Sequence, residues 1–410
     1  MNTNAAKDNY YPMPSKTPLT PPLSHDKDLP LLDVLYQQIQ ASDGFLPFDV
    51  LMQHALYHDV HGYYQQGHVF GASGDFITAP DMGPWLALAF ADLIHHGWQH
   101  MGSPPKWGLL EQGGGRGRLL SQVVRLLGEH FKQSPTHIFA VEKSALWRAE
   151  QAKHYQQAGI SVIGLASLDA LSIDVPLLIF SNELPDAFPV RCFVWQQGQC
   201  FERAIIVDGT GTLGWGIADV PFMPAPTVDN SIMQAWPEGY ISEYNTGLAA
   251  WQRQLGELLT SNGGMAFTLD YGYSQSEYYR PSRIEGTLMG HKGHQVMHDV
   301  LTHIGEADMT AHVDFTALAR IGMAHGLTAI AYMTQGGWLA SSPLVQTALQ
   351  EVAATPNAQN MRLIAHAKRL MLPHAGMGES FKLLIQSPAD VVLPDPLQAM
   401  NRLERLRIEG

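Results

Sequence analysis

The fold of this chain is decided by the stretch Leu109-Leu110-Glu111-Gln112-Gly113-Gly114-Gly115-Arg116-Gly117. Residues 107–112 are apolar enough for a short buried strand, and the apolar residues from 119 to 131 repeat at helical spacing. Glycines between a strand and a helix let the backbone approach a ligand closely, because a Cβ would collide there. The stretch therefore predicts a nucleotide-type site at the edge of an α/β sheet.

Further strands and helices alternate after this turn. Apolar strands are expected at 137–142, 161–164, 176–181, 265–269, 327–333 and 381–385, with helices that include one over 314–326 and two within 339–372. Continuous apolar runs such as Leu177-Leu178-Ile179-Phe180 are typical of parallel strands covered on both faces. The alternation implies right-handed crossovers. The predicted fold class is α/β, with a Rossmann-like sheet of about seven strands.

The composition divides the chain into six segments. We expect a proline-rich flexible tail over 1–30, a helical region with a substrate-side loop over 31–105, the first half of the core over 106–190, an inserted β-meander and helix over 191–262, the second half of the core over 263–387 and a C-terminal tail over 388–410. The meander is predicted because apolar residues alternate between glycines from 190 to 220. The apolar stretch from Pro84 to Ile94 is expected to form a helix with one buried face.

Charge and hydropathy exclude several classes of protein. The formal net charge of −13 argues against nucleic acid as a partner. No run of eighteen apolar residues occurs, so no membrane span is expected. The first thirty residues contain no arginine and lack the basic-then-apolar order of a secretion signal, which favours a cytoplasmic location. Cys192 and Cys200 could face each other across a hairpin, but plain thiols are expected in a reducing compartment.

Two acids beside the glycine turn narrow the choice of ligand. Glu111 ends the first strand, where its carboxylate could accept hydrogen bonds from the ammonium of a methionine moiety. Glu142 ends the next strand, where an acid reaches ribose hydroxyls. With Gly113, Gly115 and Gly117 as the cradle, this layout predicts S-adenosylmethionine. The plainer reading is a tight turn with solvent-facing acids nearby.

The same layout also serves NAD and FAD, so an oxidoreductase is the alternative. The dinucleotide pattern G-x-G-x-x-G would place its third glycine at position 118, where the chain has Arg118. Arg116 and Arg118 would nevertheless suit a pyrophosphate, and this keeps the alternative open.

Other candidate residues follow the later strands. Asn182, Glu183 and Asp186 come after the strand at 176–181, and Asp270 with Tyr271 ends the strand at 265–269. Ligands of open α/β sheets lie beyond the carboxyl ends of the strands, so these side chains are expected to face one cleft. An amide and carboxylates there can orient a nitrogen-bearing substrate. A turn capped by the Asn182 side chain before a proline is the plainer alternative.

Four histidines, His291, His294, His298 and His312, suggest a metal site at first sight. A structural zinc site would normally use cysteine, and the helical H-E-x-x-H signature is missing. The chain has 19 histidines, so some of them cluster without a function. We therefore expect no metal and assign these side chains to pocket lining or hydrogen bonding.

Taken together, these motifs resemble the MidA-like methyltransferases. The matching segments are Gly74 to Pro80, Glu111 to Gly117, Val141 to Ser144, Asn182-Glu183, Asp186-Ala187, Pro189 to Arg191, Asp270 to Gly272, Gly286 to Leu288, His294, Asp308 to Phe315 and Phe381 to Ile385. They occur in consistent order over residues 45 to 385. The resemblance implies a class I methyltransferase fold that uses S-adenosylmethionine, with an N-terminal helical region and an inserted β-meander.

The resemblance also implies a substrate and the roles of individual residues. Mitochondrial members of the family assist respiratory complex I assembly by methylating an arginine, so we expect a protein side chain as substrate, with a respiratory-complex subunit as one candidate, and a homodimer is a further option. Glu183, Asp186 and Asp75 are the expected catalytic carboxylates, with His312 as a further candidate. Asn182 and Thr78 join the cofactor-binding residues. A non-catalytic scaffold that binds the cofactor is the second alternative.

The chain departs from the usual family pattern at several positions. Gln112 and Gly114 stand in the turn where an apolar residue and a proline are more usual, and Leu184-Pro185 replaces two aromatic or apolar residues. The segment around Trp85 also differs, and we expect it to border the entrance to the acceptor side. These departures bear on substrate identity more than on cofactor binding.

Overall fold

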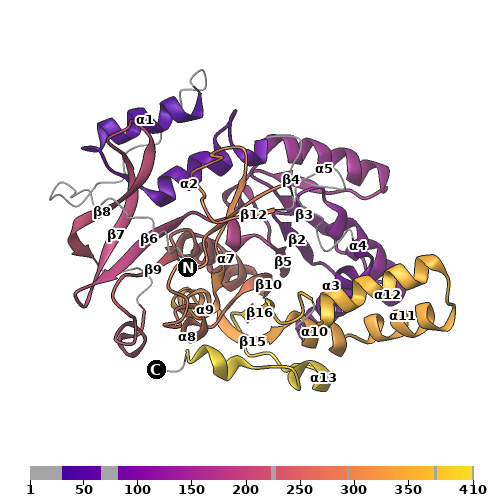
Figure 1. Cartoon of the computed structure of the whole chain (residues 1–410). Helices are drawn as coiled ribbons and strands as arrows, with labels where there is room; N and C mark the ends of the chain where they lie inside the picture. Colours follow the sequence, from indigo (N-terminus) through magenta and orange to yellow (C-terminus); the bar gives the residue numbers. More distant parts are fainter. Residues whose placement is uncertain (1–29, 66–81, 223–227, 294, 374–375, 409–410) are drawn as a thin grey trace.

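The computed structural model describes residues 30–65, 82–222, 228–293, 295–373 and 376–408. The Pro-rich tail, Asp75, Thr78, His294 and the Gly74 to Pro80 segment therefore lie outside the described residues. Two units stand side by side in Figure 1: a large sheet with its helices and a smaller, strongly curved sheet that carries the N-terminal helices α1 (Leu31–Ala41) and α2 (Phe48–Tyr57).

The large sheet is the Rossmann-like core that the sequence predicts. Its strands follow the order β15 (Thr328–Thr334), β16 (Phe381–Ser387), β10 (Gly264–Tyr273), β5 (Leu177–Asn182), β2 (Gly108–Gln112), β3 (His137–Val141) and β4 (Ile163–Leu165). The ladder from β10 to β4 is parallel, and β16 runs antiparallel to both its neighbours. A short strand, β14 (Val313–Asp314), pairs with the end of β10. The fold class is confirmed.

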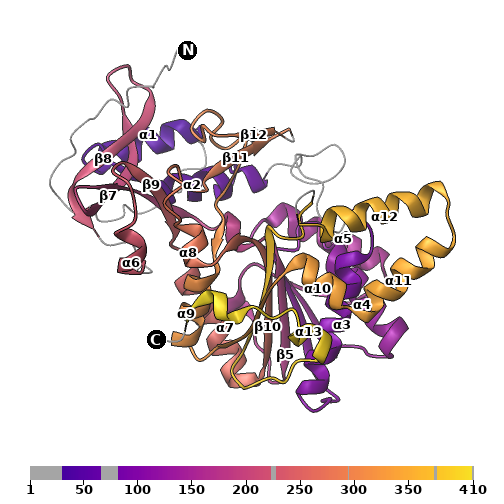
Figure 2. The same ribbon diagram turned by 60° about the horizontal axis from the view of Figure 1, so that its bottom comes forward.

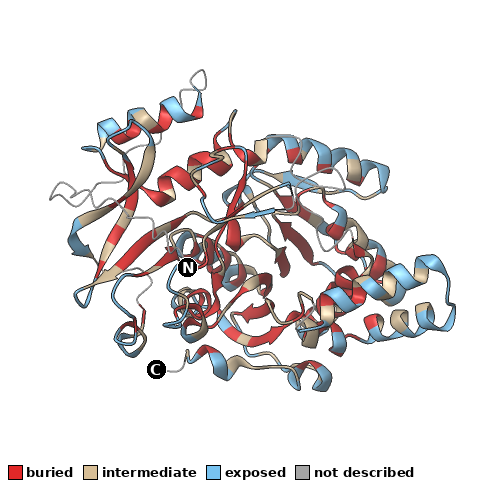
Figure 3. Cartoon of the chain, in the orientation of Figure 1, coloured by how far each residue is buried: buried red, intermediate tan, exposed pale blue. Residues whose placement is uncertain are grey.

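Alternate side chains of each central strand enter two separate cores, as the continuous apolar runs require. On one face, Leu109, Leu178 and Phe180 join the core made with α3 (Trp85–His100) and α4 (Arg118–Phe131). On the other, Leu110 and Ile179 join the core made with α7 (Leu248–Asn262) and α9 (Phe315–Ala324). Figure 3 shows the strands buried along their length while the outer helix faces are exposed.

Helix α3 differs from the expectation of one buried face. Every residue from Trp85 to Ile94 is buried, because α10 (Gln335–Ser341) and α11 (Pro343–Ala354) cover the side of α3 that faces away from the sheet. The polar Asp92 is accommodated since it accepts hydrogen bonds from the Ser342 hydroxyl and the Leu344 amide at the start of α11. The predicted place of Trp85 at the entrance is wrong, because its side chain is enclosed in the core.

The two helices predicted within 339–372 are present as α11 and α12 (Ala358–Met371), and only the end of the short α10 also falls in that range. Ser342 caps α11 and Asn357 caps α12. Figure 2 shows α11 and α12 as a pair that extends beyond α3 and α4. The segment after 388 includes α13 (Asp395–Gln398) and a 3-10 turn, η5 (Leu403–Leu406), and Leu406 is buried against the core. This segment therefore packs on the domain, although the sequence suggested a tail.

The predicted meander forms the second sheet. Its strands are β6 (Val190–Gln196), β7 (Gln199–Val207), β8 (Leu213–Phe222) and β9 (Tyr240–Asn245), all antiparallel, and β1 (Leu46–Pro47) adds an edge from the N-terminal region. Helix α2 packs on this sheet through Phe48 and Leu51, so the region before residue 60 and the insertion share one core. Cys192 and Cys200 are buried free thiols, because they pair in register with Arg203 and Trp195 instead of with each other.

Smaller elements complete the description. They are η1 (Tyr63–Gln65), α5 (Ala145–Gln157), η3 (Leu168–Ala170), η4 (Pro185–Ala187), α6 (Asn230–Met233), α8 (Gln275–Tyr278) and a three-stranded sheet of β11 (Met289–Lys292), β12 (Gln295–Met297) and β13 (Asp308–Thr310). No helix in the described ranges has the length and apolar character needed to cross a membrane.

Candidate active site

A cavity of about 670 Å³ opens at the carboxyl ends of β2, β3, β5 and β10. Most of the residues predicted for the site line it, namely Glu111, Gly113, Gly115, Glu142, Asn182, Glu183, Asp186, Tyr271 and His312. Gly117, Asp270 and Trp85 do not belong to the lining. Strands that end at one edge of a parallel sheet bring these side chains together although they are far apart in sequence.

The glycine turn is a rigid cradle with no room for side chains. Gly113 and Gly115 have φ of +67° and +51°, which L side chains rarely adopt. A Cβ on Gly114 would collide with the Glu111 carboxylate, and one on Gly113 would lie 2.9 Å from Leu184 Cδ1. The Gln151 amide fixes the turn from behind by donating to the Gly115 carbonyl at 2.9 Å. The turn can therefore lie directly against a ligand.

At Gly117 the requirement for glycine comes from helix packing. It has φ of +74° at the start of α4, and a Cβ there would lie 2.5 Å from the Tyr155 hydroxyl oxygen. The position is thus set by helix packing, and the prediction that Gly117 takes part in the cradle is not supported by where it lies.

Glu111 and Glu142 form the acidic side of the cradle. Glu111 is 2% exposed, and burial raises its pKa to about 8, helped by the nearby Glu142 charge and opposed by a backbone hydrogen bond from Leu120. Its Oε2 atom has no hydrogen-bond partner within the described chain. Burial also raises the pKa of Glu142 to about 7, although the Ser144 amide donates to its carboxylate at 3.0 Å. Buried acids in such a state suit a ligand that brings hydrogen-bond donors or a positive charge.

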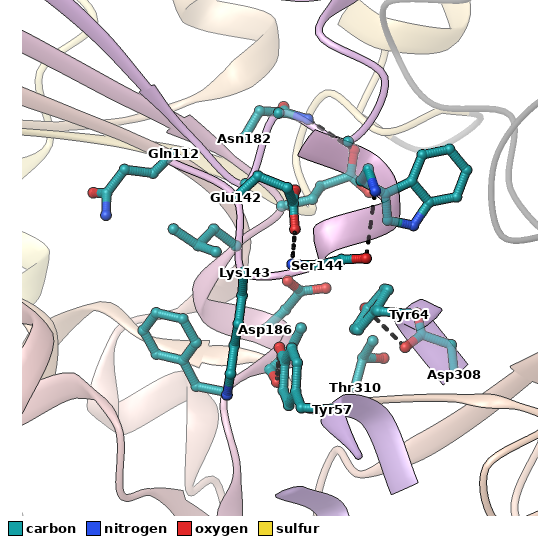
Figure 4. Close-up of a pocket in the computed structure, with 18 of the residues that line it drawn as sticks. Tyr57, Tyr64, Gln112, Glu142, Lys143, Ser144, Asn182, Asp186, Asp308 and Thr310 are labelled. Carbon is teal, nitrogen blue, oxygen red and sulfur yellow. Dashed lines mark hydrogen bonds between the residues drawn. The ribbon is translucent and has the colours of Figure 1, made fainter. Parts of the chain in front are cut away.

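Glu183 occupies a strained position at the end of β5. Its φ of +53° is unusual for a residue other than glycine, and its amide donates to the Leu269 carbonyl at 2.9 Å, which ties it to β10. The Asn182 side chain donates to the Glu183 carboxylate at 3.2 Å (Figure 4). Burial raises the pKa of Glu183 to about 7, and the charge of Asp186 adds to this. Strained backbone at a cavity is a common mark of a functional residue.

Asp186 projects into the middle of the cavity from the η4 turn (Figure 4). It is 5% exposed, and its Oδ1 atom has no partner among the residues described. Burial raises its pKa to about 6, while a hydrogen bond from Tyr271 lowers it. A buried carboxylate of this kind is costly unless a cation or donors reach it.

Asp270 supports this turn from outside the cavity, which differs from its expected place in the lining. It is fully buried and accepts hydrogen bonds from the amides of Asp186 at 3.2 Å and Tyr271 at 2.8 Å. Burial, with the charges of Asp186 and Glu183, raises its pKa well above the ordinary range. Asp270 thus positions the two neighbouring lining residues.

The lining residues that the sequence reasoning did not assign to the site include Tyr57, Tyr64, Lys143, Asp308 and Thr310. The Tyr64 hydroxyl donates to Asp308 at 2.9 Å (Figure 4). The Tyr57 hydroxyl donates to the Ala187 carbonyl at 2.9 Å. Asp308 and Thr310 stand inside a segment that resembles the family, and that was the available signal. The tyrosines belong to the N-terminal region and carry no local signal of a site.

The histidines divide between the cavity and other places. His291 and His312 line the cavity, whereas His298 does not. Burial lowers the pKa of His312 to about 4, with help from the charges of Arg283 and Lys382, so its ring is neutral at pH 7. In the part of the chain that the structure describes, no three His, Cys, Asp or Glu side chains come together as a metal site.

The cavity fits S-adenosylmethionine by its own chemistry. The unpartnered Oε2 of Glu111 suits an ammonium group, and Glu142 suits vicinal hydroxyls. The turn beside them has no room for a Cβ at Gly113 or Gly114, so its backbone stays bare. The surplus of acids over bases in the lining favours a ligand with positive charge.

The chain is similar to known methyltransferases. Residues 89–333, more than half of the chain, match the family described as "Putative S-adenosyl-L-methionine-dependent methyltransferase". A Drosophila melanogaster protein named "Protein arginine methyltransferase NDUFAF7 homolog, mitochondrial" is 26% identical over 86% of this chain and 85% of its own length. Its Mus musculus counterpart is 28% identical over 75% of this chain and 72% of its own.

A solved structure agrees with these matches. A Burkholderia thailandensis protein crystallised with S-adenosyl-homocysteine has a TM-score of 0.78 and 26% identity, and the alignment covers 90% of this chain and 95% of that one. The likeness extends over both sheets, because a match to the core alone could not cover nine tenths of the chain.

One expectation is overturned by the same comparisons. The relatives from Drosophila, Danio rerio and mouse are all named as mitochondrial proteins, so the predicted cytoplasmic location is wrong. That prediction rested on what the first thirty residues lack, and missing features are weak grounds for assigning a compartment.

Proposed function

The chain belongs to this family of S-adenosyl-L-methionine-dependent methyltransferases, and from that premise we propose that its acceptor is an arginine side chain of a protein. The names of the Drosophila and mouse relatives support a protein arginine acceptor. The observation that carries the proposal is the pair of carboxylates of Asp186 and Glu183, which both face the cavity. No Lys, Arg or His of the chain is among the groups that shift their pKa values, so the pair suits a cation supplied by the substrate.

We propose that the part of the cavity next to the glycine turn holds the cofactor. Glu111 would accept from its ammonium, Glu142 would accept from its ribose hydroxyls, and the backbone of Gly113 and Gly115 would lie against it, with Asn182 completing the set. When bound, S-adenosylmethionine supplies a methyl group activated by the positive sulfonium. The protein's contribution is to place the acceptor nitrogen in line with that methyl group.

In the part of the cavity next to the η4 turn, Glu183 and Asp186 would hold the guanidinium. A guanidinium stays protonated in water, with its lone pair delocalised, so it is a poor nucleophile until its charge is drawn away from the reacting nitrogen. Asp186 can do this by paired, charge-assisted hydrogen bonds to the remote nitrogens, while Glu183 accepts a hydrogen bond from the reacting nitrogen. Glu183 can then take the proton that the reacting nitrogen gives up, because its pKa of about 7 suits proton transfer near neutral pH.

The test is methyl transfer into a cell extract with tritium-labelled S-adenosylmethionine, followed by acid hydrolysis and amino-acid analysis. Label in methylated arginine is expected. Label in lysine or another residue would contradict the arginine acceptor, and the absence of any labelled band would favour a scaffold. A thermal-shift panel with S-adenosylhomocysteine, NAD and FAD completes the test, because an oxidoreductase would be stabilised by NAD or FAD instead.

The partner predictions stay predictions. The resemblance suggests a respiratory-complex subunit as the protein substrate, and the labelled band identified by mass spectrometry would test this. A homodimer predicts twice the mass of the 45.2 kDa chain in sedimentation analysis. No binding to nucleic acid is expected, given the net charge of −13.

A further inference from the structure

One wall of the cavity comes from parts of the chain that lie outside the core sheet. It consists of Tyr57, at the end of α2, Tyr64, in η1, and Asp308, at the start of β13. The tyrosine rings lie 5.4 Å apart, centroid to centroid, and the Tyr64 hydroxyl donates to Asp308 at 2.9 Å. Figure 4 shows these side chains gathered beside Asp186 and away from Gln112 and Asn182.

A cation already rests on this wall. The Lys143 ammonium lies 4.1 Å from the centroid of the Tyr57 ring, within the range of a cation–π interaction. Lys143 is exposed on the protein surface, so its long side chain can leave the ring without disturbing the core. The Tyr57 ring face thus already holds a cation that belongs to the chain itself.

The carboxylates make the same region suitable for a cation. Asp186 and Asp308 are both buried and both line the cavity. The Tyr64 hydroxyl donates to Asp308, and the Tyr57 hydroxyl donates to the carbonyl of Ala187, the residue after Asp186, so both carboxylates lie close to the two rings. An aromatic face near two carboxylates is complementary to a planar cation, because a guanidinium can stack on the ring while its edges bond to the acids.

We propose that Tyr57, Tyr64 and Asp308 form, together with Asp186, the subsite that recognises the cationic end of the acceptor, and that Lys143 occupies the Tyr57 face until the acceptor displaces it. This rests on the proposed function, since the acceptor is taken to be an arginine side chain. Asp186 then contacts the reacting group, while Tyr57 and Asp308 decide which side chain is admitted.

A binding experiment tests the subsite without any turnover. The protein is saturated with S-adenosylhomocysteine and titrated calorimetrically with N-acetyl-arginine methylamide and with its citrulline counterpart, a neutral compound of nearly the same shape. The wild type should prefer the arginine probe by about tenfold or more, which corresponds to the ~1.4 kcal/mol expected of a desolvated cation–π and carboxylate contact. Tyr57→Leu and Asp308→Asn should lose most of this preference.

Matched variants separate recognition from folding. Tyr57→Phe keeps the ring and should keep the preference, although it loses the hydrogen bond to Ala187. Lys143→Met should tighten arginine binding severalfold because it removes the competing cation. The dissociation constant of S-adenosylhomocysteine should stay within twofold in the Tyr57 and Asp308 variants. If Tyr57→Leu does not fold, the comparison of Asp308→Asn with Tyr57→Phe carries the test.

The outcomes distinguish this proposal from the function on which it rests. An arginine preference that is absent in the wild type, or unchanged in both Asp308→Asn and Tyr57→Leu, overturns the subsite even if the extract carries label on arginine. Loss of the preference in these variants supports the subsite. Label on another residue in the extract contradicts the arginine acceptor, and that result is obtained independently of the titrations.

Discussion

Replacing Glu111 by glutamine should change how many protons are released when the cofactor product binds. The pKa of Glu111 is raised to about 8, so the free protein carries its proton about nine times in ten at pH 7. An ammonium placed against the carboxylate favours the ionised form and returns the pKa toward its ordinary 4.5. Binding of S-adenosylhomocysteine at pH 7 should therefore release about 0.9 proton from Glu111.

Glu142 adds a smaller contribution that the experiment can separate. Its pKa of about 7 means that it is about half protonated at pH 7, so it can release up to about 0.5 proton. The wild type should thus release about 0.9 to 1.4 protons, and Glu111→Gln at most about 0.5. Affinity in the wild type should rise about tenfold between pH 6 and 7 through Glu111 alone, up to about fiftyfold if Glu142 also releases its proton, and it should level off near pH 9. The Glu111→Gln variant also lacks the negative charge, and this should weaken binding at pH 8 by about 1.5 to 3 kcal/mol.

The assay is isothermal titration calorimetry at pH 7 in phosphate and in Tris, whose different ionisation enthalpies give the number of protons released. Glu202→Gln is the matched control. Burial raises the pKa of Glu202 to about 7 as well, but this residue lies on β7 and does not line the cavity, so the wild-type proton count should persist. Equal counts in the wild type and in Glu111→Gln would refute the assignment of Glu111 to the ammonium.

Three further predictions concern stability and turnover. Gly117→Ala should destabilise the protein by about 2 to 4 kcal/mol in urea unfolding, because the new Cβ collides with Tyr155 and the backbone is left-handed. Gly159→Ala is the control, since Gly159 has φ +69° but open space around it, and it should cost only about 1 kcal/mol. Similar losses of stability in both variants would show that the collision is unimportant. Glu183→Gln should leave the dissociation constant of S-adenosylhomocysteine within twofold and reduce methyl transfer at least tenfold, so unchanged turnover would exclude a role in proton transfer. The pKa values of Glu142 and Glu183 are raised from 4.5, so their contribution to the stability of the folded protein is complete below pH 4.5 and is lost as the pH rises through about 7. The ligand-free protein should therefore unfold at a lower temperature at pH 8 than at pH 5.5. A melting temperature that rises over this range would contradict the burial of these acids.

Several features of the core could be predicted because they depend on neighbours in sequence. Apolar runs of five or six residues mark strands that are buried on both faces, and helical spacing marks the segments between them. The residues after each parallel strand then share one edge of the sheet, which is why Glu111, Glu142, Asn182 and Glu183 could be predicted to share one cavity.

Other predictions failed where a distant segment determines the environment. The sequence of α3 cannot show that α10 and α11 cover its second side, so Trp85 was expected near the entrance and lies in the core. Gly117 looked like part of the cradle, but the Tyr155 side chain on α5 sets its requirement for glycine. Asp270 follows the rule for strand ends, yet its carboxylate turns toward the amide of Asp186 and away from the cavity.

The sequence by itself determined the fold class, the methyl donor and the place of the glycine turn and its two acids at the strand ends, since these depend on local patterns along the chain. The tertiary structure decided the acceptor side. Tyr57, Tyr64 and Asp308 come from α2, η1 and β13, and they meet at Asp186 because the N-terminal helices pack on the inserted sheet and the small sheet of β11 and β13 lies over the strand ends. Such a juxtaposition depends on packing between segments some 244 residues apart, and no short stretch of sequence records it.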